Sequence, residues 1–189
     1  MRANQTTDPV IYADYLRAIQ LYRSNTRDSL AQASTLLERV VAVDDTYGPG
    51  WRLLAQTYTA RAWVGFLPLH AGFAKARAAI QRAIDIDPSD AAAIALSADL
   101  SRAYDMNLPE TARLLKRALS LSAHDETVLS AAGNLTLLTG DGPRTIAICE
   151  ELVRLDPVNG IAWSDLGFGY MMFGRYTDAI AALRKSERR

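Results

Sequence analysis

Cysteine and histidine are scarce in this sequence. The 189 residues include one cysteine, Cys149, and two histidines, His70 and His124, which lie far apart in the chain. A single cysteine excludes an internal disulfide and fits a reducing compartment. The three residues match no metal-ligand spacing. We therefore expect no disulfide, no metal and no cofactor.

Neither sign of charge predominates, and long apolar runs are missing. Lysine plus arginine and aspartate plus glutamate number 21 each, so no global field attracts nucleic acid. No apolar run approaches the roughly 18 residues of a transmembrane helix. The polar start lacks the apolar core of a signal peptide. We expect a cytoplasmic protein without nucleic-acid or membrane partners, with residues 1–9 as a flexible lead-in.

Four segments of the sequence end in a similar way, and this repetition is the main evidence for the fold. The final residues of four such endings are separated by 43, 35 and 34 residues. A period near 34 indicates helix-turn-helix pairs, and the spacing of 43 indicates an insertion of about nine residues in the second unit. The endings are Arg39–Asp44, Arg82–Asp87, Arg117–Ser122 and Glu151–Asp156.

Large and small residues also recur at helical spacing within the units. The clearest unit carries Trp163, Leu166, Gly167, Tyr170, Ala179 and Leu183. This resembles the tetratricopeptide pattern W-x2-L-G-x2-Y…A-x3-F, with Leu183 in place of the phenylalanine. An earlier unit holds Trp51, Leu54, Ala55, Tyr58, Ala76 and Ile80 in the same slots. The middle units are more degenerate.

The resemblance covers nearly all of the chain and implies an all-α fold. It predicts a right-handed superhelix of about five helix pairs, at roughly 10–42, 48–87, 91–122, 126–155 and 160–187. The corresponding repeats are about 10–47, 48–90, 91–125, 126–159 and 160–189. Small residues such as Ala98 and Gly133 would let helices approach closely, while Asp90, Asp125 and Asn159 would cap first helices.

In this family the first helices line a concave groove, which would be the partner-binding site. The alternative is that these side chains form an ordinary solvated face. The groove candidates are Arg52, Gln56, Asp99, Arg102, Asn134, Leu137, Leu138, Asp165, Phe168, Met171 and Met172. Some family members grip a peptide carboxylate with a clamp of basic and asparagine side chains. Leu96, Thr127 and Ala131 depart from that pattern, so we do not expect the clamp.

Three further features have competing interpretations. We expect the apolar insertion 63–72 to fold over neighbouring helices, with a binding lip as the alternative. We expect Cys149 to be a buried core thiol. The apolar C-terminal end predicts a covering partner, which would be another chain, a second copy in a homodimer, or further repeats.

The function expected from the resemblance is a protein–protein interaction scaffold. The opening Tyr12–Ala18 and the long unit Leu53–Ala83 resemble arrays in bacterial multidomain signalling proteins that carry cyclase, winged-helix or kinase domains. The chain would then be the regulatory or sensory region of such a protein. The alternative is a helical-repeat RNA-binding module, which needs a basic stripe. No nucleophile–base pair indicates an enzyme, although a parent protein could carry a separate catalytic domain.

Overall fold

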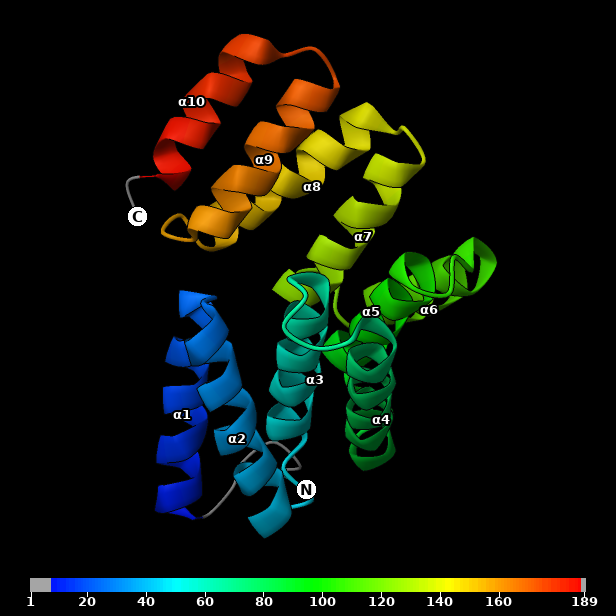
Figure 1. Cartoon of the computed structure of the whole chain (residues 1–189). Helices are drawn as coiled ribbons and strands as arrows, with labels where there is room; N and C mark the ends of the chain where they lie inside the picture. Colours follow the sequence, from blue (N-terminus) through cyan, green and yellow to red (C-terminus); the bar gives the residue numbers. More distant parts are fainter. Residues whose placement is uncertain (1–7, 188–189) are drawn as a thin grey trace.

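The computed structural model describes residues 8–187, which form ten α-helices joined by short turns (Figure 1). No β-strand occurs within that part of the chain. The helices are α1 (Pro9–Ser24), α2 (Arg27–Val43), α3 (Gly48–Trp63), α4 (Leu69–Ile86), α5 (Ala91–Ala103), α6 (Leu108–Leu121), α7 (Glu126–Leu138), α8 (Gly142–Leu155), α9 (Gly160–Met172) and α10 (Tyr176–Ser186).

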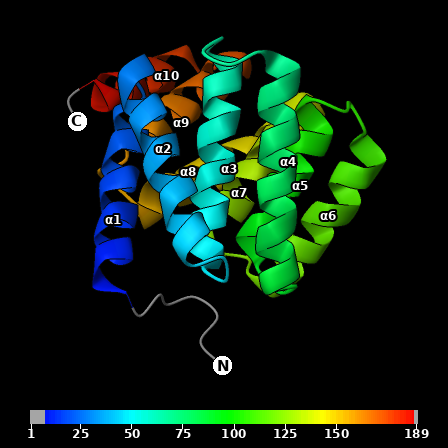
Figure 2. The ribbon, with the colours of Figure 1, turned by 60° about the horizontal axis from the view of Figure 1, so that its bottom comes forward.

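The helices pack as five consecutive antiparallel pairs. Each of α2, α4, α6 and α8 lies between its own first helix and the first helix of the next pair. The pair axes change direction along the array, so α8, α9 and α10 run across the direction of α1 to α4 (Figures 1 and 2). The chain is therefore a winding solenoid, and the predicted all-helical fold of about five pairs is confirmed.

Helix starts follow from local sequence. Each of Asp90, Asp125 and Asn159 accepts backbone N–H groups of the helix that follows, as the sequence predicts. Pro109 and Pro143 lie in the first turns of α6 and α8, where the missing N–H of proline costs no hydrogen bond. The predicted lead-in at 1–9 is wrong at its end, because Asp8 caps α1 and Pro9 begins it. Residues 1–7 lie outside the described part.

Small residues allow the two helices of a pair to approach closely. Ala55, Ala98, Gly133 and Gly167 are all buried. A Cβ atom added to Gly167 would lie 2.7 Å from Leu183 Cγ, well inside van der Waals contact. The glycine is therefore required by packing, in agreement with the sequence pattern.

The tyrosine slot connects neighbouring pairs. Tyr58 donates its hydroxyl to Glu38 on the preceding second helix, with an O–O distance of 2.6 Å. Tyr170 repeats the contact with Glu150 at 2.7 Å. Both tyrosine rings are buried. The tyrosine at this repeat position therefore packs its ring in the core and donates its hydroxyl to the preceding repeat.

The insertion in the second unit mainly lengthens its two helices. Trp63 is the last residue of α3, and Leu69 is the first of α4. Only residues 64–68 form the turn. Within it Leu67 packs against the core, and Phe66 lies under the Arg27 guanidinium at 5.5 Å. The expectation of a segment folded over its neighbours thus holds for these two residues and for His70, which contacts Tyr104 at the end of α5. It does not hold for Trp63, Val64 and Leu69, which are largely exposed.

Candidate partner-binding groove

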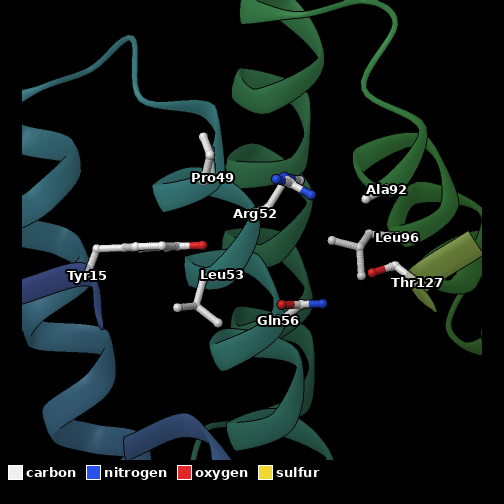
Figure 3. A pocket seen from close by; sticks show the side chains of 8 residues that line it. All are labelled: Tyr15, Pro49, Arg52, Leu53, Gln56, Ala92, Leu96 and Thr127. Atoms are coloured by element: carbon white, nitrogen blue, oxygen red, sulfur yellow. The ribbon is translucent and has the colours of Figure 1, made fainter. Parts of the chain in front are cut away.

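A small pocket of about 100 Å³ lies on the concave face, where four first helices converge. Its walls come from α1, α3, α5 and α7 (Figure 3). The lining residues are Tyr15, Pro49, Arg52, Leu53, Gln56, Ala92, Leu96 and Thr127. The predicted groove residues Arg52 and Gln56 are thus brought together, on successive turns of α3.

The cation of this pocket already has an acidic partner. Arg52 Nε lies 3.0 Å from Asp90 Oδ2, and the Asp90 side chain is only 6% exposed. The two atoms are close without the alignment of a hydrogen bond, so the contact is an ion pair. The other carboxylate oxygen of Asp90 caps α5 at Ala93. With its charge compensated, Arg52 is a weak anchor for a ligand carboxylate.

The remaining polar groups of the pocket are neutral. The Tyr15 hydroxyl points towards α3, and the Gln56 amide lies opposite Leu96 and Thr127 (Figure 3). Burial raises the pKa of Tyr15 above its ordinary value, so its phenol keeps its proton and remains a hydrogen-bond donor. Leu53 and Leu96 provide apolar surface. The pocket therefore suits a small apolar group with hydrogen-bonding atoms at its edge.

A second polar group joins α5 to α7 along the same face. Arg102 pairs with Asp99 one turn earlier, with an Nη2–Oδ1 distance of 3.1 Å. Asn134 on α7 points its amide nitrogen at both Asp99 oxygens, each 3.4 Å away. The three predicted residues are thus clustered and electrically balanced. The long Asn134 contact leaves the amide free to exchange this partner for a ligand.

The predicted apolar residues at the C-terminal end are mostly exposed, but they lie on separate elements. Leu138 and Met172 have exposed fractions of 53% and 56%, and those of Phe168 and Met171 are 44% and 42%. Leu137 is half-buried. Helix α9 packs mainly against α8 and α10, and it meets α7 near its start, where Asn159 donates to Glu126. Leu137 and Leu138 lie at the other end of α7, so the two apolar sets are described as separate groups.

Asp165 and Cys149 lie near each other at the α8–α9 junction. The protein around Asp165 excludes water and raises the pKa of its carboxyl group, although the residue is exposed. No hydrogen bond or ion pair reaches it from the described residues. Burial, with the Asp165 charge second, raises the pKa of the Cys149 thiol to about 11. The thiol is therefore protonated at neutral pH and buried, as predicted.

Some residues that line the pocket were not among the predicted groove residues. Tyr15 and Leu53 line the pocket without having been predicted there. Leu96 and Thr127 entered only as departures from the clamp, yet they form its far wall. Tyr22 on α1 lies close enough to Glu126 on α7 for that charge to raise its pKa, after burial. The spacing of Tyr15, Ile19 and Tyr22, which places them on one helix face, was the available signal.

Two classes of site are not found among residues 8–187. No three histidine, cysteine or acidic side chains are arranged to hold a metal ion. His70 instead contacts the Tyr104 hydroxyl through Nδ1 at 2.5 Å. No helix in the same range has the length and apolar character needed to cross a bilayer.

Comparisons with known proteins identify the fold. No family model and no curated protein matches the sequence. Among solved structures, the thermophilic TPR protein TTC0263 of Thermus thermophilus matches with a TM-score of 0.69 at 17% identity, covering 93% of this chain and 89% of that one. PilW, a type IV pilus biogenesis factor, matches with 0.62 at 17% identity, covering 96% and 78%.

A third structure, the human IFIT1 dimer with m7Gppp-AAAA, matches with a TM-score of 0.70 at 14% identity. The match covers 94% of this chain and 40% of IFIT1. Likeness at such identities concerns the fold alone. Together with the packing described above, it assigns the tetratricopeptide-type helical solenoid to this chain, as the sequence predicts.

Proposed function

We propose that this chain is a protein-interaction scaffold whose concave groove holds an extended segment of a partner protein. The observation that carries the proposal is the pocket built jointly by α1, α3, α5 and α7. Four elements from four different pairs converge on one small hollow. Convergence of this kind is typical of ligand sites between helices, and helical solenoids use their concave faces for binding.

The side chains along the groove indicate the chemistry of the bound segment. The pocket receives a small apolar side chain, with Gln56 and Tyr15 bonding to the adjacent backbone. The neutral cluster of Asp99, Arg102 and Asn134 bonds to polar groups farther along. Exposed methionines on α9 add adaptable apolar surface. The segment is therefore uncharged at the pocket and apolar at a second position.

The RNA-binding alternative needs a basic stripe along this groove. Instead, Arg52 is paired with Asp90 and Arg102 with Asp99. Paired cations release few counterions when they meet a phosphate backbone. No observation in this groove favours RNA over a protein segment.

We propose further that the scaffold is the regulatory or sensory region of a larger bacterial signalling protein, acts in the cytoplasm and is not itself an enzyme. The support is the resemblance of its opening and its long second unit to arrays in such proteins. Sequencing the surrounding reading frame tests this. A cyclase, winged-helix or kinase domain in the same frame is the expected result, and a frame without any such domain contradicts it.

Selected peptides test the groove directly. Peptides chosen from a random displayed library for binding to the purified chain are titrated by fluorescence anisotropy. Gln56→Trp fills the pocket and is expected to weaken binding about tenfold or more, which is about 1.4 kcal/mol. Lys116→Trp, on an exposed face of α6, is the matched control and leaves the affinity unchanged. Equal affinities for the two variants would overturn the groove assignment.

A further inference from the structure

The first two helix pairs end in a rim that is raised above the rest of the array. Helix α3 ends eight residues after its small-slot residue Ala55, whereas α5 ends five residues after Ala98. Helix α4 begins eleven residues before Ile80, whereas α6 begins seven before Leu115. At about 1.5 Å per residue, the second hairpin projects by about one helical turn.

The turn between α1 and α2 lies at the same edge as the α3–α4 turn (Figure 2). Contact between Arg27, at the start of α2, and Phe66, in the α3–α4 turn, connects them. We call residues 23–28 and 61–75 together the raised rim.

Large apolar side chains are exposed at the tip of the raised rim. The exposed fractions are 56% for Trp63, 45% for Val64 and 48% for Leu69. The Trp63 ring stands edge-on to the buried Phe73 ring with a centroid distance of 5.2 Å, which holds it in place while most of it faces solvent. A group of exposed apolar side chains on a projecting turn marks an interaction site.

Positive charge surrounds this tip, although the whole chain is neutral. Between Asp45 and Asp85 the sequence contains five arginine or lysine residues and no acidic residue. On the raised rim Arg23, Arg27 and Lys75 are exposed, and no described residue forms an ion pair with any of the three. Asp28 is the one acidic side chain within the rim's two segments. The rim therefore has a net positive charge around an apolar centre.

We propose that the raised rim docks peripherally on an anionic lipid surface. Tryptophan favours the boundary between headgroups and acyl chains, and valine and leucine gain free energy on entering it. Arginine and lysine are attracted to acidic headgroups. A projecting apolar tip also fits a deformable lipid interface, whereas a peptide segment is held by a concavity such as the groove.

Peripheral docking requires no spanning helix. The sequence-based expectation of no membrane partner rested on the lack of a long apolar run, which concerns spanning alone. The raised rim also lies apart from the groove pocket, because it is built from the ends of helices and not from their concave faces. Lipid docking and partner binding are therefore separable, and a failure of one leaves the other standing.

The test is sedimentation of the full chain with lipid vesicles. Wild type is expected to bind phosphatidylcholine vesicles containing about 30% phosphatidylserine at least tenfold more tightly than vesicles of phosphatidylcholine alone. Trp63→Ser/Val64→Ser is expected to lose about tenfold or more. Arg23→Gln/Lys75→Gln is expected to lose roughly 25-fold, about fivefold for each charge. Circular dichroism checks that each variant remains folded.

The matched control is Val43→Ser/Val158→Ser. It removes two exposed valines, 62% and 66% exposed, which lie where one pair joins the next. Its vesicle binding is expected to equal that of wild type. Equal binding of wild type to both vesicle types, or full binding by the Trp63→Ser/Val64→Ser variant, would overturn the proposal. Binding to soluble polyglutamate as tight as to the acidic vesicles would assign the rim to an acidic protein partner, and would overturn it as well.

Discussion

At the scale of single residues, Gly167 shows how closely packing restricts this sequence. An added Cβ atom there meets Leu183, whereas one added to Gly169, two residues along the same helix, has ordinary contact with Thr145 at 3.8 Å. Replacing glycine by alanine in a helix gains up to about 1 kcal/mol when there is room. We predict that Gly169→Ala stabilises the fold, while Gly167→Ala loses this gain and Gly167→Leu costs about 1–3 kcal/mol.

Urea denaturation of the three variants measures these differences. Gly169→Ala is the matched control, because it shares the helix and the substitution with Gly167→Ala. If Gly167→Leu had the same unfolding midpoint as wild type, the close approach of α9 and α10 would be contradicted.

Tyr170 gives a prediction at alkaline pH. Burial first, then the hydrogen bond to Glu150, raises the pKa of its hydroxyl to about 12, while an unfolded tyrosine titrates near 10. The hydrogen-bonded phenol therefore stabilises the folded chain fully below pH 10, and this contribution is lost as the pH rises through about 12.

Tyr170→Phe is expected to cost about 1 kcal/mol at pH 7, with a cost that shrinks between about pH 10 and 12. Denaturation of both proteins across that range is the measurement. A cost that is constant with pH would show that folding does not raise the pKa of Tyr170, and would contradict its buried, hydrogen-bonded position.

At the scale of helices, the cap residues Asp90 and Asp125 separate two contributions. Both accept backbone N–H groups, but Asp90 is buried and also pairs with Arg52. We predict that Asp125→Ala costs about 1 kcal/mol, the usual cost of a lost cap. Asp90→Ala should cost about 2 kcal/mol or more, because it also leaves the half-buried Arg52 without its partner. Thermal unfolding that ranks the two variants in the opposite order would contradict this assignment.

The sequence predicted most of the helices because the same slots recur. Asp90 and Asn159 signalled helix starts, and Ala55 and Gly167 signalled close contact between helices, since each depends on local spacing alone. The Tyr58–Glu38 bond was not predictable in this way. Its partners belong to different pairs, so their distance depends on the superhelical geometry.

The groove was predicted less completely than the helices. Arg52 and Gln56 both line the pocket, because their spacing follows the helical period, and their part in binding stays a prediction. The ion pair between Arg52 and Asp90 was not predicted, since the sequence indicated Asp90 only as a helix cap. Tyr15 was missed because the first pair departs most from the repeat pattern. The remaining groove candidates stay predictions until a ligand is bound.

At the scale of the whole molecule, the last pair leaves a core position uncovered. Leu183 is 37% exposed, whereas the equivalent residues of earlier pairs are nearly inaccessible: Leu37 at 0%, Ile80 at 3%, Leu115 at 3% and Cys149 at 6%. In those pairs the next first helix covers this position. Ile180 beside it is 53% exposed. We predict that this chain forms a homodimer through its C-terminal end.

Sedimentation equilibrium measures this association. Wild type is expected to be a dimer at high concentration, and Ile180→Ser/Leu183→Ser is expected to shift towards monomer. The vesicle-control variant Val43→Ser/Val158→Ser serves again, since it alters exposed valines elsewhere. A wild type that stays monomeric at every concentration would exclude the homodimer and leave a different covering partner.

The central claim is that the concave groove holds a protein segment, and an NMR footprint tests it most directly. Amide signals of the labelled chain are recorded with and without a selected peptide. We expect the largest changes at Arg52, Gln56 and Leu96 around the pocket, extending to Asn134, with Lys116 on the exposed face of α6 unchanged. A footprint centred on exposed faces of α4, α6 or α8, with the pocket residues unmoved, would contradict the account.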